Sequence, residues 1–179
     1  MVADYAALLL PLFGVACALL VAAGAAKSRS PSAARGALAA VGLTVPNPCI
    51  RLLGAAEIAI GGWAALRPTA LTGGMVAALY GTFAAFVLAS MRAGEAAPCG
   101  CFGAADTEIG LMHAALNAVA CAVGIAAAIA PPPGIGSVLD REPLVAMSLA
   151  LGIAGAAFAA YLAFTAFPGA WRAYGAGQR

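Results

Sequence analysis

Two cysteines one residue apart, Cys99 and Cys101, form the most compact group of reactive side chains in the sequence, within Pro98-Cys-Gly-Cys-Phe-Gly103. A thiolate is the nucleophile in disulfide exchange and a ligand for soft metals, so the pair is either a redox couple or half of a metal site. Proline and glycine on both sides oppose a helix and indicate a turn. A disulfide across one residue closes a small, strained ring, and strain raises the reduction potential. The pattern favours an exchangeable disulfide over two inert loop cysteines.

Glu57 lies within an apolar segment, where a carboxylate is expensive unless it has a partner. Such a residue indicates either a functional site or an inter-helix hydrogen bond that fixes packing. Lys27 ends the preceding apolar segment, and each charge is costly alone in lipid. We therefore expect Lys27 and Glu57 to meet inside the bundle.

Three further side chains, His113, Asn117 and Cys121, recur at four-residue intervals and so share one helix face that begins beneath the cysteine pair. A lone membrane histidine is either a hydrogen-bonded interior residue or a chemical participant. Cys17 and Cys121 lie deep in apolar segments and are predicted to be small apolar fillers. Cys49 follows two prolines, which places it at a membrane edge.

The composition is that of a polytopic membrane protein, because 64% of the 179 residues are hydrophobic and 9% are charged, with a mean hydropathy of +0.98. A net charge of +2 offers no basic surface for nucleic acid. Five scattered cysteines are too few for a secreted disulfide framework. The amino terminus has no positive region of a cleaved signal peptide, so we expect the first apolar segment to be retained.

The apolar segments predict an all-α bundle in one membrane domain, residues 1–179, because about 20 apolar residues cross the hydrocarbon core. A short helix is expected from Ser30-Pro31 to about Leu43, and residues 92–108 form the redox loop. Gly81, Ala85 and Ala89 recur every four residues and predict a face for close helix contact. The predicted spans are about 5–26, 50–66, 71–91, 109–130 and 144–167.

The CGCFG stretch at Cys99–Gly103, with Lys27, Glu57 and Asn117, resembles the MauE family of methylamine utilisation membrane proteins, within the broader DoxX-like group. The resemblance covers roughly residues 5–130 and implies a four-helix DoxX-like core, here followed by a fifth transmembrane helix. It implies a multi-pass protein of the cell inner (cytoplasmic) membrane. Its client would be the disulfide-rich small (beta) subunit of methylamine dehydrogenase, and its partner a thioredoxin-like periplasmic protein, MauD. The family often has Arg before the Asn, where this chain has Leu116.

The two indications of topology disagree. With five spans, Cys49 and the cysteine pair share one side, which carries seven Lys or Arg residues against two on the other, and this predicts a cytoplasmic cysteine side. Lys27 and Arg51 are at helix ends, where they could turn toward Glu57 and cease to mark topology. A periplasmic disulfide client needs its redox partner on the oxidising side, so we expect the cysteine loop to face the periplasm.

The leading hypothesis is a membrane thiol–disulfide relay, a possible thiol–disulfide oxidoreductase. Cys99 would exchange with the partner and Cys101 would resolve the bond, or the order would reverse if Cys101 is the more exposed of the two. Cys49 is a possible second resolving thiol. Supporting residues that tune the thiols or accept protons would be Lys27, Glu57, His113 and Asn117. One alternative is a soft-metal carrier that binds Cu(I) or Zn(II) through the pair and His113. Another is a non-catalytic scaffold for a maturation partner. No resident metal or cofactor is predicted, because the sequence contains no recognisable haem or quinone signature.

Overall fold

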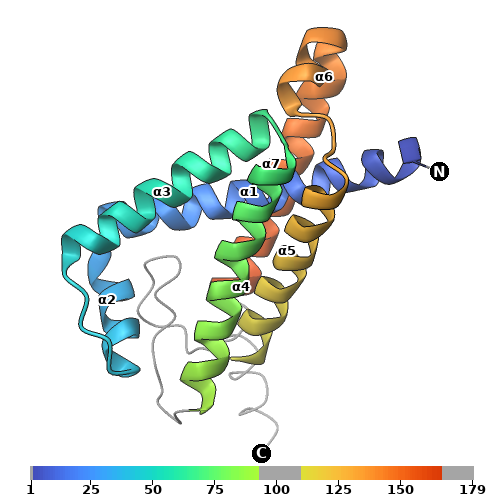
Figure 1. Ribbon diagram of the computed structural model, residues 1–179. Coiled ribbons are helices and arrows are strands. Elements are labelled where there is room, and N and C mark those ends of the chain that lie inside the picture. The colour runs from blue at the N-terminus through green and yellow to red at the C-terminus, as the bar shows by residue number, and fades with distance from the viewer. Residues whose placement is uncertain (1, 93–109, 167–179) are drawn as a thin grey trace, which may run out of the picture.

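The computed structural model describes residues 2–92 and 110–166, which form helices and contain no strand. The all-α prediction is confirmed for this part of the chain (Figure 1). The predicted redox loop lies outside it, except for Arg92. The helices are α1 (Val2–Arg29), α2 (Pro31–Ala40), α3 (Asn47–Leu66), α4 (Ala70–Arg92), α5 (Leu111–Ile129), α6 (Ile135–Arg141) and α7 (Pro143–Thr165).

Five of these helices are long and apolar enough to cross a membrane: Leu8–Arg29 of α1, and the whole of α3, α4, α5 and α7. The polytopic bundle expected from the sequence is confirmed, and the protein is a multi-pass membrane protein. The two remaining helices, α2 and α6, are too short to span.

Proline and threonine determine where several helices begin. Pro31 and Pro143 occupy the first positions of α2 and α7, where a missing N–H leaves no hydrogen bond unmade. Before α4, the backbone N–H of Thr72 donates to Oγ1 of Thr69 at 3.1 Å. The backbone N–H of Thr69 donates in return to Oγ1 of Thr72 at 2.8 Å. This reciprocal cap satisfies two donors at the start of α4.

The helices associate mainly as two antiparallel pairs, α1 with α3 and α4 with α5, and α7 lies against α1 (Figure 1). By contrast, α3 and α4 diverge from the short turn that joins them and share few contacts. The helix α2 contacts α1 and α3 at the open end of this divergence. As a result, α3 and α4 do not pack against each other over much of their length.

The apolar core lies around the middle of α1, where Phe13, Cys17 and Leu20 are almost completely buried. Cys17 is a core residue, as predicted, and Cys121 packs against the same cluster. The core is completed from the other helices by Ala64, Val76, Tyr80 and Ala127.

Within each pair, glycines let the two backbones touch. A Cβ on Gly54 would lie 2.6 Å from the backbone oxygen of Gly24, so α1 and α3 are in main-chain contact there. In the second pair, a Cβ on Gly124 would lie 2.7 Å from the backbone nitrogen of Ala77. The pairs could not approach as closely with larger residues at these positions.

The predicted small-residue face at Gly81, Ala85 and Ala89 is only partly correct. Gly81 faces Cys121 of α5, but Ala85 and Ala89 are exposed. The contact with α5 instead uses Gly73, Ala77 and Gly81, the earlier members of the same four-residue series. Because an α-helix has 3.6 residues per turn, each step of four rotates by about 40°, and the series winds off the contact.

Substitution of Gly54 by alanine should destabilise the bundle by about 1–3 kcal/mol, because the new methyl group would meet the backbone of α1. Gly62→Ala is the matched control on the same helix, since its Cβ would meet nothing within 4 Å. Thermal unfolding in detergent measures both variants. Equal midpoints for the two would contradict close packing of α1 on α3.

Candidate functional site

An ion pair is buried between α1 and α3. Nζ of Lys27 donates to Oε2 of Glu57 at 2.8 Å. Lys27 is 6% exposed and Glu57 is 0% exposed. Nζ also lies 5.0 Å from the centre of the Phe83 ring on α4, within range for a cation–π interaction. The prediction that Lys27 and Glu57 meet inside the bundle is confirmed.

The glycine contact between α1 and α3 explains why these two side chains can meet. Gly24 and Gly54 come three residues before Lys27 and Glu57, so each lies about one helical turn from its charged neighbour. A Cβ on Gly24 would lie 2.9 Å from Cβ of Glu57. The ion pair therefore sits beside the closest approach of the two helices, where water has little access.

The carboxylate of Glu57 is only half satisfied. Its Oε1 atom is buried and finds no hydrogen-bond partner among the residues that the structure describes. A buried acceptor without a partner costs about 1–3 kcal/mol. Because the unpaired Oε1 atom lowers stability, its presence needs another explanation. A site that exchanges protons or binds a ligand would provide one.

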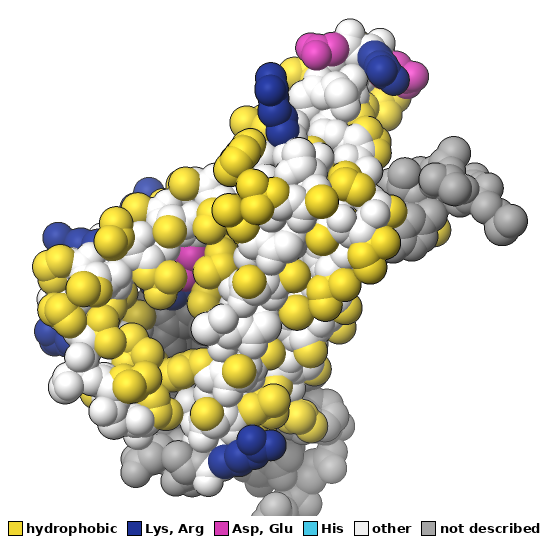
Figure 2. All heavy atoms as spheres, viewed as in Figure 1, with side chains coloured by type: hydrophobic (Ala, Val, Ile, Leu, Met, Phe, Trp, Pro, Cys, Tyr) yellow, Lys and Arg dark blue, Asp and Glu magenta, His cyan; other side chains and the backbone are white. Residues whose placement is uncertain are grey.

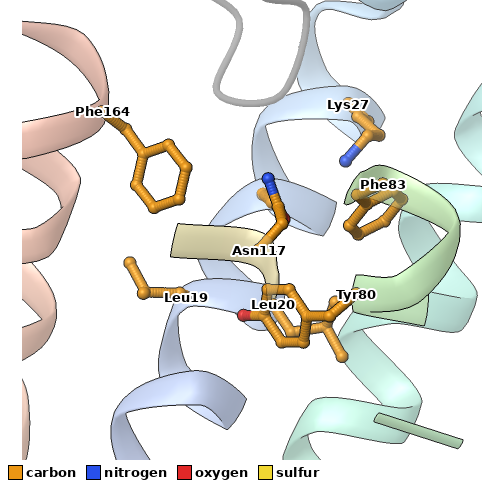
Figure 3. A pocket seen from close by; sticks show the side chains of 8 residues that line it. Leu19, Leu20, Lys27, Tyr80, Phe83, Asn117 and Phe164 are labelled. Carbon is orange, nitrogen blue, oxygen red and sulfur yellow. The ribbon is translucent and has the colours of Figure 1, made fainter. Parts of the chain in front are cut away.

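A cavity of about 20 Å³ joins Lys27 to Asn117 of α5 (Figure 3). Figure 3 shows the two side chains at this cavity together with the rings of Tyr80, Phe83 and Phe164. Nδ2 of Asn117 donates to the backbone oxygen of His113 at 2.7 Å. Three predicted site residues from three helices, Lys27, Glu57 and Asn117, are thus brought together.

His113 holds the end of α7 against the start of α5. The backbone N–H of Gly110 donates to its Nδ1 at 3.3 Å, and its Nε2–H donates to the backbone oxygen of Phe164 at 3.0 Å. The ring is 1% exposed. Because backbone groups engage both nitrogens, this arrangement favours an interior hydrogen-bonding residue and leaves no nitrogen lone pair for a metal. A supporting role in redox chemistry stays a prediction.

The predicted redox cysteines, Cys99 and Cys101, fall outside the described residues, so their role stays a prediction. Cys49 is a free, exposed cysteine near the start of α3. Within residues 2–92 and 110–166, no three His, Cys, Asp or Glu side chains are grouped to hold a metal ion.

Sequence reasoning missed the aromatic residues around Lys27. The hydroxyl of Tyr80 donates to the backbone oxygen of Ala16 at 2.6 Å, which ties α4 to α1. The rings of Tyr80 and Phe83 meet edge to face, with centres 6.1 Å apart. Their three-residue spacing on α4 placed them on one face, but that pattern is also typical of ordinary helix packing.

A helical bundle with five potential spans and a buried Lys–Glu pair defines a class, the multi-pass membrane proteins with an intramembrane polar site. Comparison with known families narrows the class. The family described as methylamine utilisation protein MauE matches residues 4–130, more than half of the chain, so the chain belongs to the MauE family. The protein is therefore a methylamine utilisation membrane protein. No curated protein and no solved structure gives a significant match.

Loss of one partner of the ion pair should destabilise the protein more than replacement of both. Lys27→Met or Glu57→Gln alone leaves a buried charge or polar group unpaired, at a cost of about 3–5 kcal/mol. The double variant removes both charges at similar volume and should recover much of that loss. Unfolding in detergent compares the variants. A double variant as unstable as the worse single variant would show that the two side chains are not coupled.

Proposed function

We propose that this protein is a membrane thiol–disulfide relay in which Cys99 and Cys101 cycle between dithiol and disulfide. By family resemblance, it exchanges with a thioredoxin-like, MauD-like periplasmic protein. Its client is then the small subunit of methylamine dehydrogenase, whose disulfide formation, processing or transport it assists. The family match supports this assignment, because residues 4–130 include both cysteines and the polar site.

The observation that carries the proposal is the position of the polar site in the bundle. The chain leaves α4 at Arg92 and enters α5 at Leu111, and the cysteine pair lies between these two points in sequence. Asn117 lies about two turns into α5 and shares a cavity with Lys27. The buried ion pair therefore lies near the end of the bundle to which the cysteine segment is joined, where it can accept or supply protons for thiol chemistry.

The exchange balances without a further oxidant. The Cys99 thiolate attacks a disulfide of the partner, forms a mixed disulfide and displaces one partner thiolate. The Cys101 thiolate then attacks the sulfur of Cys99 and displaces the second partner thiolate. One S–S bond breaks and one forms, and two electrons pass to the partner. The reverse steps carry two electrons the other way. The exposed thiol of Cys49 is available to resolve the mixed disulfide instead.

We propose a periplasmic orientation for the cysteine side in the cell inner membrane. Lys27 is neutralised inside the bundle by Glu57, so it is a poor marker of a cytoplasmic end. Arg51 is exposed, and the suggestion that it turns toward Glu57 is wrong. Arg51 therefore still counts as a positive marker of the cysteine side, and the orientation that we propose rests instead on the need to meet a client on the oxidising side of the membrane.

Replacement of Cys101 by serine should trap the mixed disulfide between Cys99 and the partner, because the resolving thiol is lost. Non-reducing electrophoresis of membranes, followed by mass spectrometry, detects and identifies the adduct. Cys17→Ser is the control, since Cys17 is a buried core residue. A membrane-impermeant maleimide applied to single-cysteine variants tests the orientation. If neither Cys99 nor Cys101 reacts from the periplasmic side after reduction, the relay and the orientation both fail.

A further inference from the structure

A second hollow, separate from the cavity at Asn117, opens between α2, α3 and α4. Its volume is about 150 Å³, and its walls are almost entirely apolar. They include Ala37 and Leu38 of α2, Ile50 of α3, and Phe83 and Phe86 of α4. Figure 2 shows it as a recess in the face between α3 and α4. We call it the α2–α4 groove.

The groove opens on the outer surface of the bundle. Leu53 and Thr82, which line it, are exposed residues on the membrane-spanning helices α3 and α4. A molecule dissolved in the lipid could therefore enter from the side. The groove forms because α3 and α4 diverge, so it belongs to the arrangement of the helix pairs.

One charged group lies at the groove among its described lining residues, the ammonium of Lys27. Within the described part of the chain this ammonium makes one hydrogen bond, to Glu57, so two of its three N–H donors remain for a ligand. An apolar pocket with one or a few placed polar groups is the usual form of a small-molecule site. The groove thus has apolar walls and a hydrogen-bond donor at its inner end.

The charge balance decides which kind of polar group fits. Glu57 neutralises Lys27, so an anionic head group would gain no net charge attraction and would face a carboxylate. A neutral carbonyl oxygen accepts a hydrogen bond from Lys27 without that repulsion. The site therefore matches a neutral, lipid-soluble carbonyl compound better than a fatty acid.

We propose that the α2–α4 groove binds a quinone. One quinone carbonyl accepts a hydrogen bond from Nζ of Lys27, and the ring packs against Phe83 and Phe86. The apolar tail leaves past Leu53 into the lipid. Of neutral lipid-soluble carbonyl compounds, quinones combine a flat ring, which suits the aromatic wall, with a carbonyl at its edge.

Use of the quinone as an electron acceptor rests on the proposed relay. Oxidation of the Cys99–Cys101 dithiol to a disulfide releases two electrons and two protons. One quinone takes up the two electrons and the two protons and becomes a hydroquinone, so the exchange balances. The binding site itself stands on residues outside the cysteine segment.

Binding is measured with radiolabelled decylubiquinone and the full chain in lipid nanodiscs. We expect saturable binding that weakens at least about tenfold in Lys27→Met/Glu57→Gln, because the ammonium donor is lost. Leu53→Trp, which blocks the groove while keeping the ion pair, should weaken it similarly. Leu52→Trp is the matched control, since Leu52 is an exposed neighbour outside the groove.

Decanoate and decane, added as competitors, test the choice of ligand. Both should compete poorly, the first because it is anionic and the second because it has no acceptor. The proposal would be overturned if decanoate or decane displaced the label better than unlabelled decylubiquinone does. It would also be overturned if binding were not saturable, or if Leu52→Trp and Leu53→Trp bound the quinone with equal affinity. The Cys99→Ser/Cys101→Ser variant separates the two hypotheses. Quinone binding with normal client maturation in that variant would refute the relay alone, and absent binding in the unaltered chain would refute the groove alone.

Discussion

The ion pair between Lys27 and Glu57 is the interaction on which the rest of this structure depends. In an apolar bundle neither charge is tolerable alone, so α1 and α3 must keep the register that brings the two together. The main-chain contact at Gly24 and Gly54 provides that register. The same contact excludes water from the pair, which strengthens the hydrogen bond and also makes any unpaired atom costly.

Lys27 lies between two hollows, and this position connects the features of the site. On one side is the small cavity shared with Asn117 and Phe164, and on the other is the α2–α4 groove. Residues of α4, α5 and α7 line the cavity with Lys27, and residues of α2, α3 and α4 line the groove with it. Oε1 of Glu57 has no hydrogen-bond partner among the described residues, so the pair can still accept a proton or a hydrogen bond there. These properties suit the role that we propose for the pair, which is to accept or supply protons for the thiol–disulfide relay.

Much of the fold could be predicted from the sequence, because the length of an apolar run alone indicates a membrane span. The meeting of Lys27 with Glu57 was also predictable, because a charge in lipid needs a partner of opposite sign and only 9% of the residues are charged. Other contacts depend on how helices distant in sequence cross. The hydrogen bond from His113 to Phe164 and that from Tyr80 to Ala16 are of this kind. The departure of Ala85 and Ala89 from the α5 contact follows from helix rotation. The groove has no motif at all, because it arises from the divergence of α3 and α4.

The most direct test of this account is a distance measurement across the ion pair in a bilayer. Lys27 is the only lysine in the chain, so ¹⁵N-lysine labelling marks a single ammonium. Solid-state NMR with ¹³C-labelled glutamate then reports dipolar coupling between Nζ and a side-chain carboxylate. The account predicts strong coupling, in keeping with the 2.8 Å separation of Nζ and Oε2, and its loss in Glu57→Gln. Absence of coupling in the folded protein, or coupling that persists in Glu57→Gln, would contradict it.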